Sequence, residues 1–300
     1  MIDAGKLRAC LVDQWGLAGP TVEVHNGGMN SATWFVSEAG ERWVAKAVVP
    51  ESRRSFAGGL AVAGHVEAGG IRAGAPVPTR QGNLVADVDG VPVALLTRVA
   101  GDGLRSTGPA EQRLIGSTLA RVHAALADVS SHDAERFHWV DAGAPHLAIR
   151  PWVRPAVTAV LGEYDAMAAE SLSWGLLHTD PAPEAFRLNP VTGECGLIDW
   201  STAMTGPLLY DLASAVMYVG GLARADPLVE AYVAGGVMSR TEAEQGLPTM
   251  VRFRWAVQAD YFARRLTAGD LTGIASTADN EAGLADAHRG LHSGARAVCL

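Results

Sequence analysis

The chain has 300 residues, of which 48% are hydrophobic and 19% are charged, and its net charge is −8. This composition is ordinary for a globular protein and excludes a chain that is mostly disordered. The negative charge argues against a nucleic-acid partner, because such proteins need a basic surface to neutralise phosphates. It is compatible with a cationic small substrate, but many acidic enzymes bind neutral ones.

The cysteines and the apolar stretches indicate the cellular compartment of the protein. Cys10, Cys195 and Cys299 lie far apart and fit neither a disulfide framework nor zinc-ligand spacing, so we expect reduced thiols and a cytoplasmic protein. The longest apolar stretches fall far short of the ~20 residues that a membrane span requires. The N-terminus lacks a signal-peptide pattern, and we expect no membrane partner.

About the first 95 residues are rich in predicted strands. Strands are expected over Thr21–Val24, Thr33–Ser37 and Arg42–Val49, and a further hairpin over Asn83–Asp87 and Val91–Thr97. Arg53–Ala68 is the predicted helix of this part, although three glycines weaken its helical propensity. Asn26-Gly27-Gly28 and Ala39-Gly40 are turn signals between strands.

After Gly101 the pattern changes from strands to helices. Helices are expected over Glu111–Leu126, Ala156–Ser171, Leu208–Val219 and Met250–Leu266, a strand over Trp174–Leu177, and a hairpin over Ala185–Leu188 and Glu194–Trp200. A strand-rich front and a helical body predict an α+β fold with two lobes. We expect a nucleotide-binding lobe over residues 1–100 and a catalytic, substrate-binding lobe over residues 101–300.

Two aspartates flank the predicted internal hairpin. His178-Thr179-Asp180 follows the strand Trp174–Leu177, and Asp199 in Ile198-Asp199-Trp200 ends the hairpin. Phosphoryl transfer needs one carboxylate that orients the attacking hydroxyl and another that holds Mg²⁺ against the triphosphate. Either motif alone is weak, since His-x-Asp is common and a lone Asp is often bound by backbone amides. Their joint occurrence around a hairpin favours a kinase-type site.

These motifs resemble those of the aminoglycoside phosphotransferase and choline kinase-like superfamily, whose fold is that of a bilobal protein kinase. The resemblance implies a transferase that uses ATP and Mg²⁺. It implies that Asp180 is the catalytic base, that His178 orients the loop, and that Asp199 binds Mg²⁺. Asp211 is similar to the structural acid of that family.

The loop after Asp180 departs from the family pattern. The Asn that supplies a second metal contact is expected five residues later, where this chain has Ala185. A methyl group cannot bind a metal, so either the adjacent Glu184 supplies a carboxylate or Glu184 is an exposed loop residue and the metal site is poorer.

Lys46 in Trp43-Val44-Ala45-Lys46 resembles the kinase lysine that reaches the nucleotide phosphates. The alternative is an edge-strand lysine that points to water. The turn Asn26, Gly27 and Gly28 lies where kinases place their phosphate-covering loop, and Thr97 and Val99 occupy the position of the adenine-binding hinge. No Gly-x-x-x-x-Gly-Lys-Ser/Thr motif is present, which argues against a P-loop enzyme.

The acid that pairs with Lys46 and the acceptor-binding residues are less defined. Glu51 and Glu67 flank the Arg53–Ala68 helix, but neither lies where the family's acid is expected. Several C-terminal residues either contact a cationic acceptor or form a solvated helix face: Glu230, Asp260, Tyr261, Asp279 and Glu281. We interpret His123 as a packed histidine.

The sequence thus predicts an ATP- and Mg²⁺-dependent kinase that phosphorylates a hydroxyl of a small molecule, such as an antibiotic, an amino alcohol or a sugar. The alternative, motivated by Ala185, is a nucleotide-binding protein with little catalytic activity. A protein kinase is disfavoured, because no His-Arg-Asp-Leu loop is present.

Overall fold

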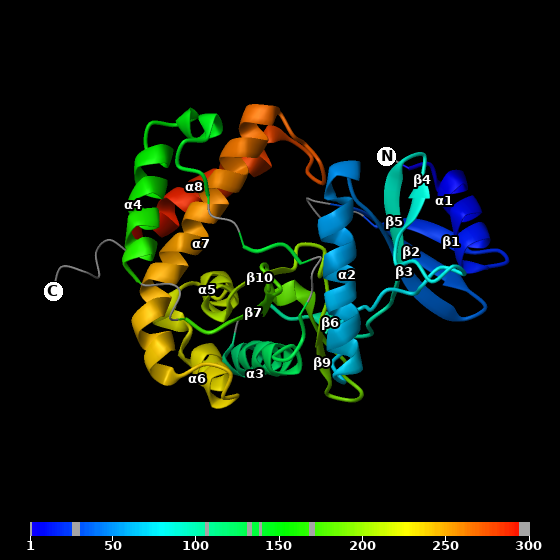
Figure 1. The fold of residues 1–300 in the computed structure, drawn as a ribbon, viewed down its shortest axis with the longest axis horizontal. Helices are drawn as coiled ribbons and strands as arrows, with labels where there is room; N and C mark the ends of the chain where they lie inside the picture. Colours follow the sequence, from blue (N-terminus) through cyan, green and yellow to red (C-terminus); the bar gives the residue numbers. More distant parts are fainter. Residues whose placement is uncertain are drawn as a thin grey trace.

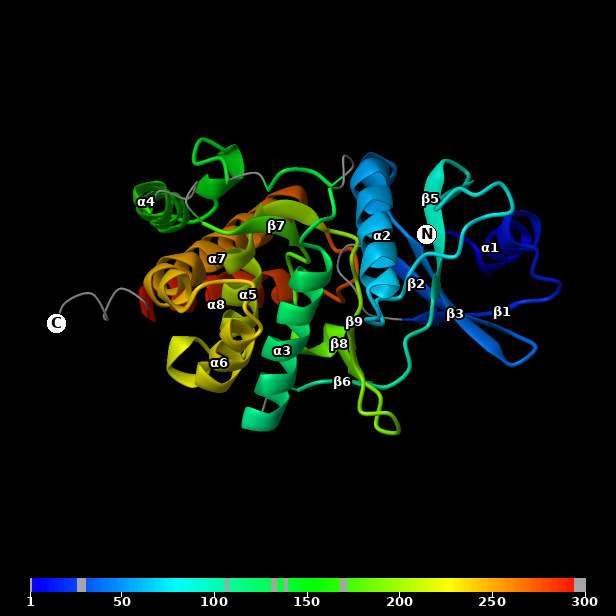
Figure 2. The same cartoon turned by 60° about the horizontal axis from the view of Figure 1, so that its bottom comes forward.

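The computed structural model describes residues 2–25, 31–105, 108–130, 134–137, 140–167 and 172–293. An antiparallel sheet near the N-terminus and a larger, mainly helical part near the C-terminus make up the fold (Figure 1). Helix α2, Arg53–Ala68, lies between these two parts in both views (Figures 1 and 2). The predicted phosphate-covering residues Asn26, Gly27 and Gly28 lie outside the described residues.

The N-terminal sheet, as far as the described residues show it, has five antiparallel strands in the order β1-β2-β3-β5-β4. They are β1 Thr21–His25, β2 Ala32–Glu38, β3 Glu41–Ala47, β4 Ala86–Val88 and β5 Val91–Thr97. Lys46 on β3 pairs with Thr33 of β2 on one side and with Ala94 of β5 on the other. Lys46 therefore lies on the central strand, and the edge-strand alternative is excluded.

Side chains of the sheet alternate between two packing faces, as the β pleat requires. On one face, Leu95 of β5 belongs to a cluster with Leu7 of helix α1, Ala4–Cys10, which a π-helical turn at Leu11–Trp15 extends. On the other face, Ala94 packs with Phe56 of α2. Helix α2 also contributes Val62, Ala63 and Val66 to the large C-terminal core. It is thus held by both parts of the molecule.

The C-terminal part is built around a long helix, α7, which packs against α4, α5 and α8 (Figure 1). The helices are α3 Pro109–Ala125, α4 Val153–Ala166, α5 Leu208–Tyr218, α6 Asp226–Ala234, α7 Arg240–Ala268 and α8 Thr277–Ser293. The strands are β6 Asp102–Gly103, β7 Trp174–Leu177, β8 Phe186–Leu188, β9 Cys195–Leu197 and β10 Met204–Pro207. β7 pairs with β10, and β8 pairs with β6 and β9.

Most predicted elements are present, with shifted ends. The predicted bounds of α2 and β7 agree with the structure, and the internal hairpin forms as β8 and β9. The predicted helix over Met250–Leu266 is longer, because α7 begins at Arg240 and continues through Pro248. The sequence pattern did not predict α1, α6 and α8. None of the described helices has the length and apolarity that crossing a membrane requires.

Candidate active site

The loop that carries Asp180 is fixed by a buried carboxylate. β7 ends at Leu177, and the backbone N–H groups of His178 and Thr179 donate to Asp211 Oδ2 and Oδ1, both at 2.7 Å. Asp211 lies in the first turn of α5 and is completely buried. A carboxylate can accept several hydrogen bonds, and those it accepts from amides fix the backbone that precedes Asp180. Asp211 therefore has the structural role expected from the resemblance.

His123 and Tyr232 form a buried hydrogen-bonded chain that ends at Asp211. His123 Nε2 lies 3.1 Å from Asp211 Oδ2, and His123 Nδ1 lies 2.7 Å from the hydroxyl of Tyr232. Burial raises the pKa of Tyr232 well above its ordinary value, so this hydroxyl stays protonated. The Asp211 carboxylate can only accept, so Nε2 donates to it, and Nδ1 is left to accept from the Tyr232 hydroxyl. His123 is a packed residue, as the sequence predicted.

Two contacts join the Asp180 loop to the Asp199 loop. His178 Nε2 donates to the carbonyl oxygen of Ile198 at 2.8 Å, and its ring packs edge-on against Trp200. Thr179 Oγ1 donates to Thr202 Oγ1 at 2.9 Å. The imidazole of His178 thus binds one loop to the other.

Lys46 and Asp199 form a direct ion pair between the sheet and the C-terminal part. Lys46 Nζ donates to Asp199 Oδ1, and Ser201 Oγ donates to the same oxygen at 2.9 Å. Burial favours the neutral form of Asp199. The charge and hydrogen bond of Lys46 outweigh burial and hold the pKa of this carboxyl below its ordinary value. Asp199 is thus an ionised carboxylate beside a buried cation.

Asp180 lies on the same loop system and has two partners from the C-terminal helices. The hydroxyl of Tyr218 donates to Asp180 Oδ1 at 2.5 Å, and Arg254 Nη2 donates to the same oxygen at 2.9 Å. The Asp180 side chain remains 53% exposed, whereas that of Arg254 is only 9% exposed. The carboxylate is therefore anchored on one side and open to a ligand on the other.

Glu184 and Ala185 lie in the 3-10 turn Pro183–Ala185, between Asp180 and β8. Ala185 is buried in the C-terminal core, and its carbonyl oxygen accepts from Ile198 N at 3.0 Å. Glu184 is exposed, and its charge contributes to the raised pKa of Tyr218. Ala185, where the family has Asn, therefore lies beside the Asp199 loop. Glu184 lies near Tyr218, which binds Asp180.

The predicted hinge residues lie next to the Asp199 loop. Thr97 ends β5, and its N–H donates to the carbonyl oxygen of Ala75 at 2.9 Å. A Cβ placed on Gly74, which has a φ of +69°, would contact Thr97, Val99 and Ile198 at 3.5 to 3.9 Å. The predicted hinge residues Thr97 and Val99 and the residue before Asp199, Ile198, thus pack around Gly74.

Glu67 and the acids considered for acceptor binding have partners elsewhere in the protein. Glu67 accepts from the N–H groups of Ala73 and Ala75 at 3.2 and 2.9 Å, so it fixes the chain that follows α2 and does not pair with Lys46. The other acids are bound by neighbouring groups, namely Asp260 by His146, Glu281 by Arg150, Glu230 by Arg240 and Asp279 by the N–H of Ser276. The Tyr261 hydroxyl accepts from Arg265 at 3.3 Å.

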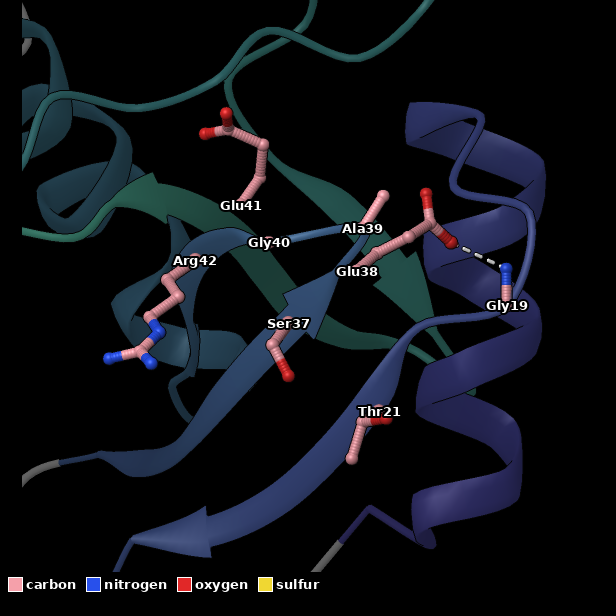
Figure 3. Close-up of a pocket in the computed structure, with 8 residues that line it drawn as sticks. All are labelled: Gly19, Thr21, Ser37, Glu38, Ala39, Gly40, Glu41 and Arg42. Atoms are coloured by element: carbon pink, nitrogen blue, oxygen red, sulfur yellow. Dashed lines mark hydrogen bonds between the residues drawn. The ribbon is translucent and has the colours of Figure 1, made fainter.

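A surface hollow lies away from these residues, at the β2–β3 turn. Figure 3 shows the residues that line it and the hydrogen bond from Gly19 N to Glu38 at 2.5 Å. Its lining consists of Gly19, Thr21, Ser37, Glu38, Ala39, Gly40, Glu41 and Arg42. Lys46 lies toward the opposite end of β3 from this turn, so the hollow is separate from the candidate site.

Sequence reasoning missed Tyr218 and Arg254. Arg254 occupies a buried position of α7 beside Val251 and Phe253. A buried guanidinium needs an anionic partner, so an arginine among the apolar residues of this helix indicates a nearby carboxylate. The identity of that partner was not accessible, because Asp180 lies 74 residues earlier in the chain.

The donor set fits a magnesium ion held with few protein ligands. No cluster of three or more His, Cys, Asp or Glu side chains is found within the described ranges. Asp199 offers a partly exposed carboxylate on a fixed loop, and Mg²⁺ is commonly bound by one or two carboxylates together with substrate phosphates. Asp199 therefore fits this role, and the Ala185 methyl does not.

The profile of the phosphotransferase enzyme family matches residues 21–247 of the chain. Homoserine kinase from Hyphomonas neptunium (strain ATCC 15444) is 31% identical over 159 residues, which are 50% of this chain and 48% of that protein. Homoserine kinase from Methylobacillus glycogenes is 29% identical over 198 residues, 63% of this chain and 60% of that protein. The chain thus spans about half to three fifths of the length of these curated relatives.

Solved structures share the fold along nearly the whole chain. A microcompartment-associated aminopropanol kinase has a TM-score of 0.75 at 17% identity, covering 98% of this chain and 97% of its own. Amicoumacin kinase hAmiN, in complex with AMP-PNP, Ca²⁺ and Ami, has a TM-score of 0.74 at 14% identity, covering 97% and 94%. The α+β kinase-like fold predicted from the sequence is confirmed.

Proposed function

Because the chain belongs to the phosphotransferase enzyme family, we propose that it transfers the γ-phosphate of ATP to a hydroxyl group of a small molecule. The observation that carries the proposal is the Lys46–Asp199 ion pair beside a loop whose backbone Asp211 fixes. In this proposal Lys46 is the phosphate-binding cation, Asp199 the metal-binding carboxylate and Asp180 the base, with the Asp180 and Asp199 loops joined by His178.

We propose the following roles. Lys46 binds phosphate oxygens of ATP, and the segment from Thr97 to Val99 offers backbone groups to adenine. Asp180 orients the acceptor hydroxyl and accepts its proton while the hydroxyl oxygen bonds to the γ-phosphorus. The bond between that phosphorus and the bridging oxygen breaks, and ADP leaves with the electron pair. Asp199, with Glu184 as a second carboxylate, would hold Mg²⁺, which neutralises charge on the phosphates.

We further propose residues 1–100 as the nucleotide-binding lobe and residues 101–300 as the lobe that binds the acceptor. The relatives support hydroxylated amines as the first acceptors to test, since they include homoserine kinases and an aminopropanol kinase. Asp260, Glu281 and Glu230 give no such guidance, because their carboxylates form ion pairs with neighbouring His146, Arg150 and Arg240.

A second candidate, a nucleotide-binding protein with little transfer activity, is favoured by two observations. Ala185 supplies no metal ligand, and Glu67, the one acid in the sequence of α2, does not contact Lys46. Active protein kinases use a Lys–Glu ion pair at that helix, and here Lys46 pairs with Asp199 instead.

An ADP-release screen separates the two candidates. The protein is incubated with MgATP and a library of hydroxylated amines, amino acids, sugars and antibiotics, and ADP is measured with and without each acceptor. We expect release well above the acceptor-free rate for at least one hydroxylated amine. Saturable binding of MgATP without acceptor-dependent release across the library would instead support the second candidate.

A further inference from the structure

Both donors to Asp180 contact the same carboxylate oxygen. Tyr218 Oη and Arg254 Nη2 lie 2.5 and 2.9 Å from Asp180 Oδ1. Within the part of the chain that the structure describes, no donor is bonded to Oδ2. Oδ1 of the candidate base therefore accepts two hydrogen bonds, and Oδ2 is available to a ligand.

The two donors are themselves fixed by the packing of α5 against α7. Tyr218 is the last residue of α5, and Ser214 lies one turn earlier on the same helix. Arg254 Nε donates to Ser214 Oγ at 3.0 Å, and the guanidinium carbon lies 5.8 Å from the centre of the Tyr218 ring. The guanidinium thus has three neighbours in fixed positions, and its orientation is set before any ligand binds.

Both groups keep their protons over the whole working range of pH. Burial raises the pKa of the Tyr218 hydroxyl, and the nearby Asp180 charge adds to this. Burial alone would lower the pKa of Arg254, but Tyr210, Tyr218 and Asp180 outweigh it and raise that pKa above its ordinary value. Tyr218 and Arg254 are therefore permanent donors and do not compete with Asp180 for the acceptor's proton.

We propose that Tyr218 and Arg254 are positioning residues that hold Oδ1 of Asp180, so that Oδ2 faces the acceptor hydroxyl. This inference rests on the proposed kinase function. Phosphoryl transfer depends more on alignment of the nucleophile than on the strength of the base. A misplacement of about 1 Å can lower the rate about 100-fold. A carboxylate bound through one oxygen loses its rotation and presents the other oxygen in a fixed direction.

The positive charge of Arg254 has a second consequence. Asp180 must approach a triphosphate that carries several negative charges, and like charges repel each other. Arg254 lies on the side of Asp180 that faces the helices, where it balances the carboxylate without blocking Oδ2. An acceptor amine is therefore not required at this position to neutralise Asp180.

Tyr218→Phe is the sharpest test, because it removes one hydroxyl and keeps the ring. We expect kcat to fall about tenfold while the KM for ATP stays unchanged, since Tyr218 acts through the base. In the Asp180→Asn background the same substitution should cause no further loss. Arg254→Lys should lower kcat by a similar or larger factor, because an ammonium group lacks the guanidinium's geometry. Wild-type kcat in Tyr218→Phe, or an equal loss in both backgrounds, would overturn the proposal.

Two matched variants control for general damage. Tyr164→Phe removes another buried tyrosine hydroxyl from the C-terminal core, and Arg252→Lys alters an Arg–Glu pair two residues from Arg254 on α7. Both controls should keep the wild-type kcat. If they lose activity as Tyr218→Phe and Arg254→Lys do, the losses reflect packing and the positioning role is refuted.

Thermal melting tests the same contacts without turnover. If Tyr218 binds Asp180, the shift in Tm caused by Tyr218→Phe should shrink in the Asp180→Asn background, because the partner carboxylate is already lost. Equal shifts in both backgrounds would show that the two side chains are uncoupled and would refute the proposal. A wild-type protein that phosphorylates no acceptor but shows this coupling would contradict the proposed function while leaving the contact established.

Discussion

Thr179 and Asp199 both have left-handed backbone conformations, with φ angles of +74° and +75°, although neither is glycine. For a β-branched residue such as threonine this region is strongly disfavoured, and such residues cost roughly 1–3 kcal/mol each. Thr179 keeps this conformation because Asp211 binds its N–H and Thr202 binds its hydroxyl. Ser201 and Lys46 bind the Asp199 carboxylate. The two loops are thus held in place by contacts that exist without ligand.

The side chains at positions 184 and 185 determine how many protein oxygens can bind the proposed Mg²⁺. We expect Glu184→Ala to raise the Mg²⁺ concentration needed for half-maximal activity by about tenfold, because it removes the second proposed carboxylate. Glu194→Ala, which removes an exposed carboxylate from the β8–β9 turn, is the control and should leave that concentration unchanged. The measurement is a Mg²⁺ titration of ADP release. An unchanged midpoint for Glu184→Ala would leave Asp199 as the one carboxylate ligand of the proposal.

At the residue scale, the sequence predicted the parts of the site that lie close together in the chain. The burial of Lys46 on a central strand followed from its apolar neighbours, and the joining of the Asp180 and Asp199 loops followed from the hairpin. Tyr218 and Arg254 were not predicted, because their contacts depend on how α5 packs against α7. Helical periodicity gives the face that a residue occupies, but it does not give the partner across the interface.

At the scale of elements, α2 approaches the Asp199 loop unusually closely. A Cβ on Gly59 would lie 1.9 Å from the carbonyl oxygen of Trp200, so only glycine permits this contact. In the kinase pattern an acid on this helix pairs with the strand lysine, and here no such acid faces Lys46 among the described residues. Backbone packing at Gly59 therefore sets the distance between α2 and the Asp199 loop.

Substitution of Gly59 tests this role of α2. Gly59→Ala should destabilise the protein by about 1–3 kcal/mol through overpacking, and it should weaken MgATP binding because the Asp199 loop must move. Gly64→Ala on the same helix has open space around it, and it should stabilise the protein by about 0.5–1 kcal/mol. Denaturant unfolding and nucleotide titration measure both effects. If Gly59→Ala stabilised the protein as Gly64→Ala does, the close contact would be refuted.

Element ends were predicted where local signals are strong and missed where packing decides. α2 and β7 were predicted with their observed bounds, because a helical stripe and an apolar run define them. The first turns of α7, from Arg240 onward, have few apolar residues, and Pro248 reads as a helix breaker. Ser239 caps this end by accepting from Glu242 N at 3.1 Å, and burial of Ala243 and Leu247 holds the helix before the proline.

At the scale of the molecule, the site lies where the N-terminal sheet meets the helical part. The Lys46–Asp199 ion pair and the Gly59–Trp200 contact both join residues of the first 68 positions to the loop after β9. The same fold is found in solved kinases at 14–17% identity, so this fold tolerates extensive change in sequence. The fold alone does not identify the acceptor, because one fold can serve many functions.

The central claim is that Asp180 directs phosphate transfer from ATP to an acceptor hydroxyl. The most direct measurement is ³¹P NMR of the wild-type protein and Asp180→Asn with MgATP and the best acceptor from the screen. We predict a phosphomonoester signal with the wild-type protein and a rate about 100- to 10,000-fold lower with Asp180→Asn, at unchanged affinity for MgATP. Formation of the phosphomonoester at the wild-type rate by Asp180→Asn would contradict the account.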